Sequence, residues 1–555
     1  MSSFTNLIQV LAVLVTSTAF KLLFVYSYHS TDFEVHRNWM AITHSLPLSR
    51  WYFESTSKWT LDYPPFFAWF EWLLSQIAVH IDPKMCVIQS SPYVSRNTIL
   101  FQRLTVIVSE LILPFSLWRL CLALSHKSCY LMKHRLLLTE ALFAFNYGLI
   151  LIDHIHFQYN GMLFGILLLS AAFLVEEKYI KAAVCFTFLL NLKHIFLYLA
   201  PVYFVYILFN YCFGQRKFIA SLVNTSMVGI AVLSTTLLSF GPFLYTNQGQ
   251  QVISRLFPFG RGLSHAYWAP NYWALYNSAE KLLSASNNFF HFWPEVNSSK
   301  ASMTGGLVRE FTFEILPNIR PHHTMCISLL FMLPNLVRCA RKSAAFSKRC
   351  SSDSYVEYLI ALVAAAWSCF MFGWHVHEKA ILMVLLPLNL LAMAVPNYRF
   401  LAFYATTLGH YSLIPLIPTK AEMPAVVSMF LAYTAIHWLT LFRLHPASKA
   451  AGNQRHMTDG VSFFRRLGQL HLWGLIVLFI FTRIIFPLTT WDRRLPFFPL
   501  MATSAYTALG LWFALLYFLS STVLGSHSKS IRAQAQAQPQ EQQQEKKNKK
   551  KLKTN

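Results

Sequence analysis

The stretch "FIASLVNTSMVGIAVLSTTLLSFG", residues 218–241, contains no charged side chain and directly follows Arg216 and Lys217. About 20 mostly apolar residues are enough for an α-helix to cross the hydrocarbon core of a bilayer. Similar runs recur along the chain, which has 555 residues, 55% of them hydrophobic and only 12% charged. A water-soluble protein of this length could not bury so much apolar surface. The sequence therefore predicts an integral membrane protein without a sizeable soluble domain.

The same length criterion predicts an all-α polytopic protein with about fourteen transmembrane helices. The candidate spans are residues 4–26, 98–122, 135–152, 160–175, 179–192, 194–212, 218–241, 322–340, 355–372, 378–395, 399–414, 422–442, 467–488 and 500–522. The expected domains are 1–97, the first span and a loop with two interfacial helices; 98–241, a transmembrane bundle; 242–321, a second long loop; 322–524, a C-terminal bundle; and 525–555, a disordered basic tail.

Lysine and arginine residues in the short connections predict the orientation, because basic loops tend to stay in the cytosol. This rule places both ends of the chain in the cytosol and the loops 27–97 and 242–321 on the opposite face. The tail is Gln-rich and then Lys-rich, a composition typical of disorder. Its lysines either attract anionic lipid or, through Lys551 and Lys553, resemble a dilysine retrieval signal of the endoplasmic reticulum. Asn297 in "NSS" is a potential glycosylation site in the second loop.

Polar and ionisable residues gather on the face opposite the cytosol. The stretches that carry them are "STDFEVHRNW" (30–39), "LDYPPFFAWFEW" (61–72), "DHIHFQYNG" (153–161), "LKHIF" (192–196), "SRLFPFGRGLSHAYWAPNYWALYN" (254–277), "GWHVHEKA" (373–380) and "TTWDRRLPFF" (489–498). Ionisable groups at membrane depth are costly, so their concentration at one level favours a functional site over ordinary polar helix ends. The nine cysteines contain no C-x-x-C motif, and neither a disulfide framework nor a zinc site is predicted.

The first long loop is expected to contain two helices on the membrane surface. Thr31 and Glu34 match a T-x-x-E capping box, so the first helix should begin there and end before Pro47. It would turn Asp32, His36 and Arg37 towards water or substrate, opposite one apolar stripe. The stripe consists of Val35, Trp39, Ile42 and Leu46.

The second helix is expected at the double proline, Pro64 and Pro65, because proline suits a first helical turn and keeps the preceding residue extended. Asp62 would then project just ahead of a helix N-terminus, whose positive end favours an ionised carboxylate. A rigidly held carboxylate at the lipid–water boundary can act as a general base on a substrate hydroxyl. The alternative is a helix-capping acid that takes no part in chemistry.

Several of these motifs resemble one known family. "STDFEVHRNW", "LDYPPFFAWFE", "DHIHFQYNG", "SRLFPFGRGLSHAYWAPN" and "FGWHVHEKAIL" are similar to the endoplasmic reticulum glucosyltransferases that use dolichyl phosphate glucose. The resemblance spans nearly the whole chain, and "GWHVHEKA" and "GLSHAYWAPN" favour the branch that adds the second glucose. It implies a GT-C architecture in the endoplasmic reticulum membrane, with a luminal catalytic centre in the first loop. It also implies transfer with inversion from dolichyl phosphate glucose to the dolichyl pyrophosphate-linked Glc1Man9GlcNAc2 precursor, forming an α-1,3 linkage without a metal or other cofactor.

The residues suit that chemistry. A single displacement at the anomeric carbon needs one base, for which we expect Asp62, and stabilisation of the phosphate that leaves. Candidate partners of the phosphate are Arg261, His265, His377 and Lys379, with Lys193 and His194 as weaker candidates, and Glu378 either takes part or forms a structural ion pair with Lys379. The remaining expected substrate-binding residues are Asp32, Arg37, Tyr63, Asp153, His154, His156, Gln158 and Asn160. A satisfied buried histidine is an equal interpretation of His154 or His156.

Other functions remain open. The sister activity, which adds the first glucose, and a lipid-linked mannosyltransferase share the same class of chemistry. A polytopic transporter would have ionisable residues and broken helices near the middle of the membrane and a repeated architecture, and no repeat is evident. The expected partners are the two lipid-linked substrates and the bilayer, and no nucleic acid.

Overall fold

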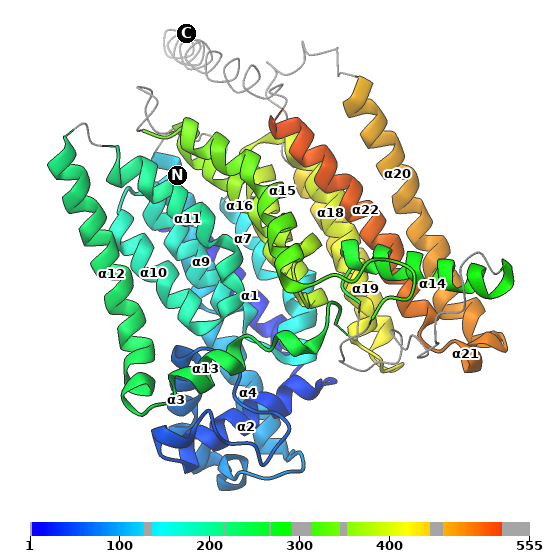
Figure 1. Ribbon diagram of the computed structural model, residues 1–555, viewed down its shortest axis with the longest axis horizontal. Coiled ribbons are helices and arrows are strands. Elements are labelled where there is room, and N and C mark those ends of the chain that lie inside the picture. The colour runs from blue at the N-terminus through cyan, green and yellow to red at the C-terminus, as the bar shows by residue number, and fades with distance from the viewer. Residues whose placement is uncertain are drawn as a thin grey trace, which may run out of the picture.

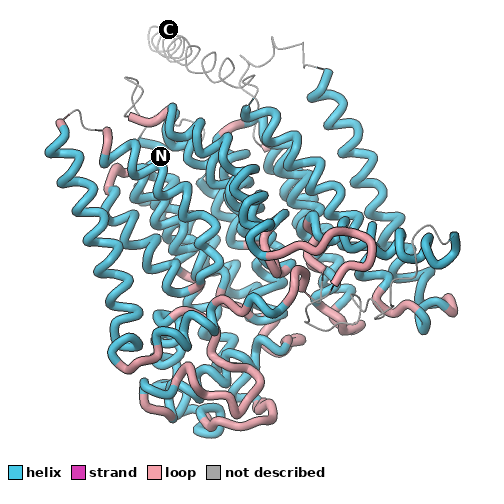
Figure 2. The backbone as a smooth tube through the Cα atoms, in the orientation of Figure 1, coloured by secondary structure: helices cyan, strands magenta, loops and turns pink. Residues whose placement is uncertain are grey.

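The computed structural model describes residues 3–126, 136–214, 217–265, 268–290, 312–344, 352–444 and 459–523. Within these ranges the chain is predominantly helical and has no β-strand, only two isolated β-bridges. Figure 1 shows the long helices side by side in one bundle, with α2, α3 and α4 gathered at one end. Loops are concentrated at that end in Figure 2, and we call it the loop end of the bundle. Asn297 and the tail 525–555 lie outside the described residues.

The helices follow one another with short connections. Their bounds are α1 Ser3–Leu22, α2 Thr31–Ser45, α3 Pro65–Ile81, α4 Arg96–Ser109, α5 Ile112–His126, α7 Leu136–Ala144, α8 Tyr147–Leu149, the π-helix η3 Ile150–Phe157, α9 Asn160–Val175, α10 Tyr179–Leu192, the 3-10 helix η4 His194–Leu199, α11 Ala200–Ile207, the π-helix η5 Leu208–Cys212, α12 Phe218–Tyr245, α13 Gly249–Leu256, α14 Tyr272–Phe290, α15 Pro321–Arg341, α16 Ser352–Phe372, the 3-10 helix η7 Glu378–Ile381, α17 Leu382–Ala394, α18 Arg399–Ser412, α19 Met423–Phe442, α20 Asp459–Ile480, α21 Trp491–Arg494 and α22 Phe498–Val523.

The prediction of a multi-pass membrane protein is confirmed. In the described part of the chain, nine helical segments are long and apolar enough to cross a membrane, among them 218–245, 354–372 and 498–523. Asn160–Val175 and Tyr179–Leu192 are apolar but shorter. The predicted number of fourteen spans is not confirmed, since α17 and α18 have only 13 and 14 residues.

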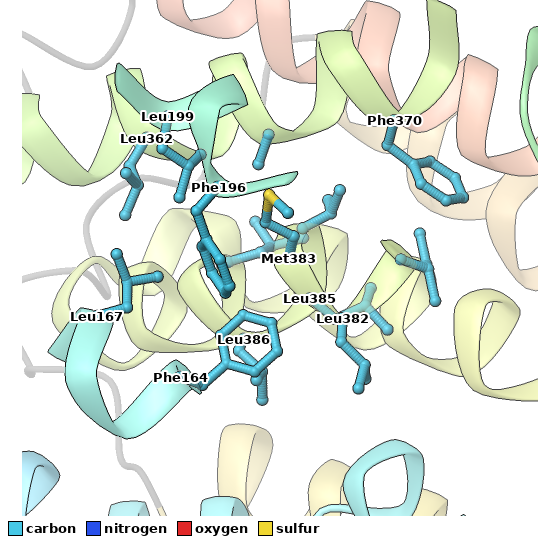
Figure 3. Packing of buried hydrophobic residues seen from close by; sticks show 14 of the residues in the cluster. Phe164, Leu167, Phe196, Leu199, Leu362, Phe370, Leu382, Met383, Leu385 and Leu386 are labelled. Carbon is cyan, nitrogen blue, oxygen red and sulfur yellow. The ribbon is translucent and has the colours of Figure 1, made fainter. Parts of the chain in front are cut away.

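The helices divide into a buried centre and an apolar periphery. The span 354–372 is 94% buried, and every residue of α17 from Leu382 to Met393 is buried. Figure 3 shows Phe164, Leu362 and Leu386 converging between α9, α16 and α17. In contrast, only 17% of the apolar window in α12 is buried. Such an exposed apolar face is stable where lipid tails, not water, surround it.

Helix α2 begins and ends where it is predicted, but its capping and environment differ from the expectation. The N-cap is Ser30, whose hydroxyl accepts from the N–H of Asp32, so the expected Thr31 capping box does not form. The expected glutamate of that box, Glu34, instead pairs with Arg37. Both faces of α2 are buried, because the helix packs against α3 and the 83–86 turn. It is therefore not an interfacial helix.

Helix α3 begins at Pro65, with Pro64 as the residue before it in extended conformation, as predicted. Phe67, Ala68 and Glu71 are buried, and Leu73 and Ile77 on the other side are more than half exposed. The apolar exposed strip suits contact with lipid. The helix fixes the position of the LDYPP segment that precedes it.

Candidate active site

Side chains from four separate segments meet at the loop end. Asp32 lies in the first turn of α2, and Gln158 and Asn160 lie between η3 and α9. Lys193 follows α10, and Lys379 lies in η7. The helices place these residues together because each segment begins or ends a helix at the same level of the bundle.

A continuous chain of hydrogen bonds joins these side chains, and we call it the polar chain. Asp32 Oδ2 accepts from Nζ of Lys379 at 2.5 Å and from Nε2 of Gln158 at 2.8 Å. Asn160 donates to Oε1 of Gln158 at 3.0 Å and to Oδ1 of Asp153 at 2.8 Å. Lys193 donates to Oδ1 of Asn160 at 3.2 Å. The polar chain therefore holds two lysines in place with only part of their hydrogen-bonding capacity used.

Two further predicted residues flank the polar chain. His156 Nε2 lies 3.7 Å from Oδ2 of Asp32, within ion-pair distance if the ring is protonated. Tyr63 presents its ring face to Nζ of Lys193, which lies 5.2 Å from the ring centroid. Burial lowers the pKa of Lys193 to about 8, the charge of Asp153 opposing that shift. A lysine in this environment can gain an anionic ligand at little further desolvation cost.

Asp62 lies beside the polar chain and faces Arg261, which comes from the second long loop. The two are an ion pair with 3.3 Å between Oδ2 of Asp62 and Nη2 of Arg261. The second loop is held on the first one by Gln248, which donates to the carbonyl of Leu48 at 2.8 Å. Arg255 fixes it further by donating to Oγ1 of Thr60 at 2.9 Å. These contacts bring together residues separated by 199 positions in sequence.

A third group consists of His265, His377 and Glu378. Nδ1 of His377 lies 2.8 Å and Nδ1 of His265 lies 3.6 Å from Oε2 of Glu378. Two isolated β-bridges, Ser264 with Val376 and Trp268 with His377, hold the segments together. The ligand atoms of the three residues lie within 4.8 Å of one another, a spacing that could hold a metal ion. The expected Glu378–Lys379 ion pair does not form, because Lys379 bonds to Asp32.

The surroundings separate the two carboxyl groups Asp32 and Asp62 in acidity. Burial raises the pKa of Asp62, and the charge of Arg261 only partly opposes this. Burial also acts on Asp32, but there Lys379 and His156 outweigh it and hold the pKa well below its usual range. The expectation that a helix terminus keeps Asp62 strongly ionised is therefore wrong in direction. A carboxyl with a raised pKa is the better proton acceptor of the two.

Two predicted site residues point elsewhere. Arg37 is fully buried, and its guanidinium donates to Glu34 and to the carbonyls of Met85 and Val87 at 3.1 and 2.9 Å. It ties α2 to the end of the first loop and does not face water. His154 is 2% exposed and bonds to Glu110 below the polar chain. His36, also expected to face water, is buried against Glu71, with 2.7 Å between Nδ1 and Oε1.

The sequence analysis missed Glu110 and Arg103. Both lie in the predicted span 98–122, and an ionisable residue in an apolar span is a signal that could have identified them. Arg103 is 2% exposed and donates to the carbonyls of Tyr28 and Ile155 at 2.8 and 2.9 Å. It therefore supports the backbone of η3 from inside the bundle.

Comparison with known proteins agrees with this geometry over nearly the whole chain. Residues 17–518 match the model of the ALG6, ALG8 glycosyltransferase family. The dolichyl pyrophosphate Glc1Man9GlcNAc2 alpha-1,3-glucosyltransferase of Mus musculus is 42% identical over 518 residues, 92% of this chain and 94% of its own. The protein of that name from Arabidopsis thaliana is 41% identical, covering 90% and 95%. The probable enzyme of that name from Drosophila melanogaster is 43% identical, covering 92% of each chain.

The matched region contains every segment of the loop-end site, from Asp32 in α2 to Lys379 in η7. Its helical, multi-pass architecture fits an enzyme whose substrates are held in a bilayer. The chain belongs to the ALG6, ALG8 glycosyltransferase family.

Proposed function

We propose that the chain transfers glucose from dolichyl phosphate glucose to the dolichyl pyrophosphate-linked Glc1Man9GlcNAc2 oligosaccharide, adding the second glucose in an α-1,3 linkage. The observation that carries the proposal is the meeting of a carboxyl of raised pKa, Asp62, with cations from three other segments. Those cations are Arg261, Lys193 and Lys379. The names of the relatives support the choice of acceptor.

Asp62 is the general base in this reaction. The acceptor hydroxyl attacks the anomeric carbon of the glucose while Asp62 takes its proton, and the bond from that carbon to the phosphate oxygen breaks. Because attack comes from the face opposite the leaving phosphate, the β-linked donor yields an α-linked product. A phosphate leaves without a protonating acid, so no second carboxylic acid is needed. Asp32 cannot serve as the base equally well, since Lys379 keeps its pKa low.

The cations stabilise the leaving phosphate, whose negative charge grows in the transition state. Lys379 is 8% exposed and Lys193 is half-buried, so both act where water screens their charge less than at a surface. Arg261 is 46% exposed and pairs with Asp62 through one nitrogen. His265, His377 and Glu378 extend the site and supply hydrogen bonds, and the reaction requires no metal ion from them.

We place the loop end in the lumen of the endoplasmic reticulum and the opposite end in the cytosol. The connections at that opposite end are short and basic: Lys178 lies between α9 and α10, and Arg338, Arg341 and Lys342 close α15. Basic short loops favour the cytosolic side. Dolichyl-linked substrates would then reach the polar chain from the luminal leaflet.

Reconstitution in liposomes tests the proposal. The purified chain is supplied with dolichyl phosphate glucose and with acceptor lipids that carry no glucose or one glucose, and the product is analysed for linkage. We expect one glucose to be added in α-1,3 linkage to the Glc1 acceptor. Transfer to the glucose-free acceptor alone would contradict the proposal and assign the sister activity.

The same assay tests the base. Asp62→Asn keeps the size of the side chain and removes its ability to accept a proton. We expect turnover to fall by at least about 100-fold, the usual contribution of a positioned general base, with the yield of folded protein unchanged. Normal turnover by this variant would remove Asp62 from the mechanism.

A further inference from the structure

Glu110, which the proposed reaction does not use, lies buried beneath the polar chain. It stands in the turn between α4 and α5 and is 3% exposed. Its Oε1 lies 3.0 Å from Nζ of Lys21 on α1. Its Oε2 lies 2.5 Å from Nε2 of His154 on η3. A buried carboxylate is stable only when it is paired, so these contacts tie three segments together inside the bundle.

Glu110 also packs against the residue that binds Asp153. A Cβ atom on Gly161 would lie 2.4 Å from Cγ of Glu110, so the close approach requires glycine at this position. The N–H of Gly161 donates to Oδ2 of Asp153 at 2.6 Å. Glu110 therefore contacts both the residue that follows Asp153 in sequence and a residue that binds its carboxylate. Asp153 in turn holds Asn160, the inner member of the polar chain.

The backbone between these contacts needs external support. Residues Ile150–Phe157 form a π-helix, a wide turn that often occurs at functional sites. Phe157 at its end has a φ of 94°, a value that side chains other than glycine rarely adopt. Such a conformation persists only where the surrounding structure holds it. The bond from His154 to Glu110 and those from Arg103 to the carbonyls provide that hold.

We propose that Glu110 is a positioning residue for glucosyl transfer. It fixes η3 through His154 and the start of α9 through Gly161, and so keeps the polar chain in register with Asp62. Lys21 neutralises it within the membrane. The inference rests on the proposed function, since it takes transfer from dolichyl phosphate glucose as the reaction that is positioned.

Glu110→Gln tests the proposal, because glutamine has the same shape but loses the charge that orders His154 and Lys21. The matched control is Glu140→Gln on α7. Glu140 is 1% exposed, and neither of its carboxylate oxygens hydrogen-bonds to a residue in the described ranges. Both variants and the original chain are reconstituted in liposomes. Turnover and the KM for dolichyl phosphate glucose are measured per folded molecule, with the folded amount taken from gel filtration and thermal unfolding in detergent.

We expect Glu110→Gln to lower kcat by about 100-fold, the cost of misplacing reacting groups by about 1 Å. Glu140→Gln should keep the original kcat. His154→Gln should lower kcat to a similar extent, and the Glu110→Gln/His154→Gln double variant should be no worse than either single one. Such non-additivity is expected where two residues act through one contact. A merely structural role would reduce the amount of folded protein and leave kcat per folded molecule unchanged.

Each other outcome overturns the proposal. A normal kcat in folded Glu110→Gln means that the contact is structural only, and an equal loss in Glu140→Gln means that any buried glutamate has this effect. If Glu110→Gln does not fold, Lys21→Met/Glu110→Gln removes both charges and is judged by the same kcat. If that variant also fails to fold, Glu110 acts in folding and the proposal is wrong. Inactivity of the original chain with this donor would instead refute the proposed function.

Discussion

Replacing Arg261 by glutamine separates the acidity of Asp62 from the rest of the site. The guanidinium lies 3.3 Å from the carboxylate and opposes the effect of burial, which raises the pKa of Asp62. Without Arg261 that pKa rises further. Because the base must be ionised to act, activity is lost as the pH falls through this pKa, and the acid limb of the pH profile moves to higher pH.

The size of the shift follows from the geometry. The side chains are 46% and 26% exposed, so water screens the pair and its Coulomb energy at 3.3 Å is about 1 kcal/mol. One pKa unit corresponds to about 1.4 kcal/mol, which gives a shift of about 0.7 pH unit. The loss of phosphate binding through Arg261 would lower the height of the profile, but it would not move its acid limb.

The assay is kcat/KM for glucose transfer in proteoliposomes at pH values across the acid limb. Arg261→Lys keeps the charge and should leave the limb within about 0.3 pH unit of the original, a fraction of the expected shift. Arg493→Gln removes an exposed arginine of α21 and should not move the limb at all. If Arg261→Gln lowers activity equally at every pH, Asp62 is not the group that titrates, and the assignment of the base fails.

Three further changes test other parts of the site. Lys379→Met removes a buried cation that bonds to Asp32, and we expect the KM for dolichyl phosphate glucose to rise by about 10-fold or more, as for a lost charge-assisted hydrogen bond; an unchanged KM would place the phosphate elsewhere. Arg37→Met leaves Glu34 buried without its partner and should cost about 3–5 kcal/mol of stability, measured by thermal unfolding; a stable variant with reduced turnover would instead return Arg37 to the substrate site. Chelation by EDTA should leave turnover unchanged, since lysine and arginine stabilise the phosphate; lost activity that Mg²⁺ or Mn²⁺ restores would assign a metal to His265, His377 and Glu378.

Local sequence rules succeeded where neighbouring residues decide the structure. Pro64 and Pro65 start α3, and Pro47 follows the end of α2, because proline restricts its own and the preceding residue. The apolar runs are equally reliable, since a span is defined by its length and hydropathy alone. The rules failed for α2, where buried Arg37 and His36 lie on what seemed a water-exposed face. Their partners, Glu34 and Glu71, bury them by pairing, which periodicity does not reveal.

The site was only partly predictable for a similar reason. Motifs such as LDYPP and HFQYN identified Asp62, Gln158 and Asn160 as polar residues on one membrane face. They did not indicate that Arg261 pairs with Asp62 or that Lys379 pairs with Asp32, contacts between residues 199 and 347 positions apart. They also gave the wrong direction for the acidity of Asp62, because burial, which only the packed structure defines, outweighs its local neighbours.

The sequence by itself determined that this chain lives in a bilayer, where its helices begin at the prolines, and which motifs carry the chemistry, because hydropathy and backbone restriction act over a few residues. Only the tertiary structure decided which carboxyl is the more basic, which cations meet it, and how Glu110 supports the π-helix below. Those properties depend on burial and on charges brought together from distant segments, and Coulomb interactions and desolvation follow distance in space, not distance along the chain.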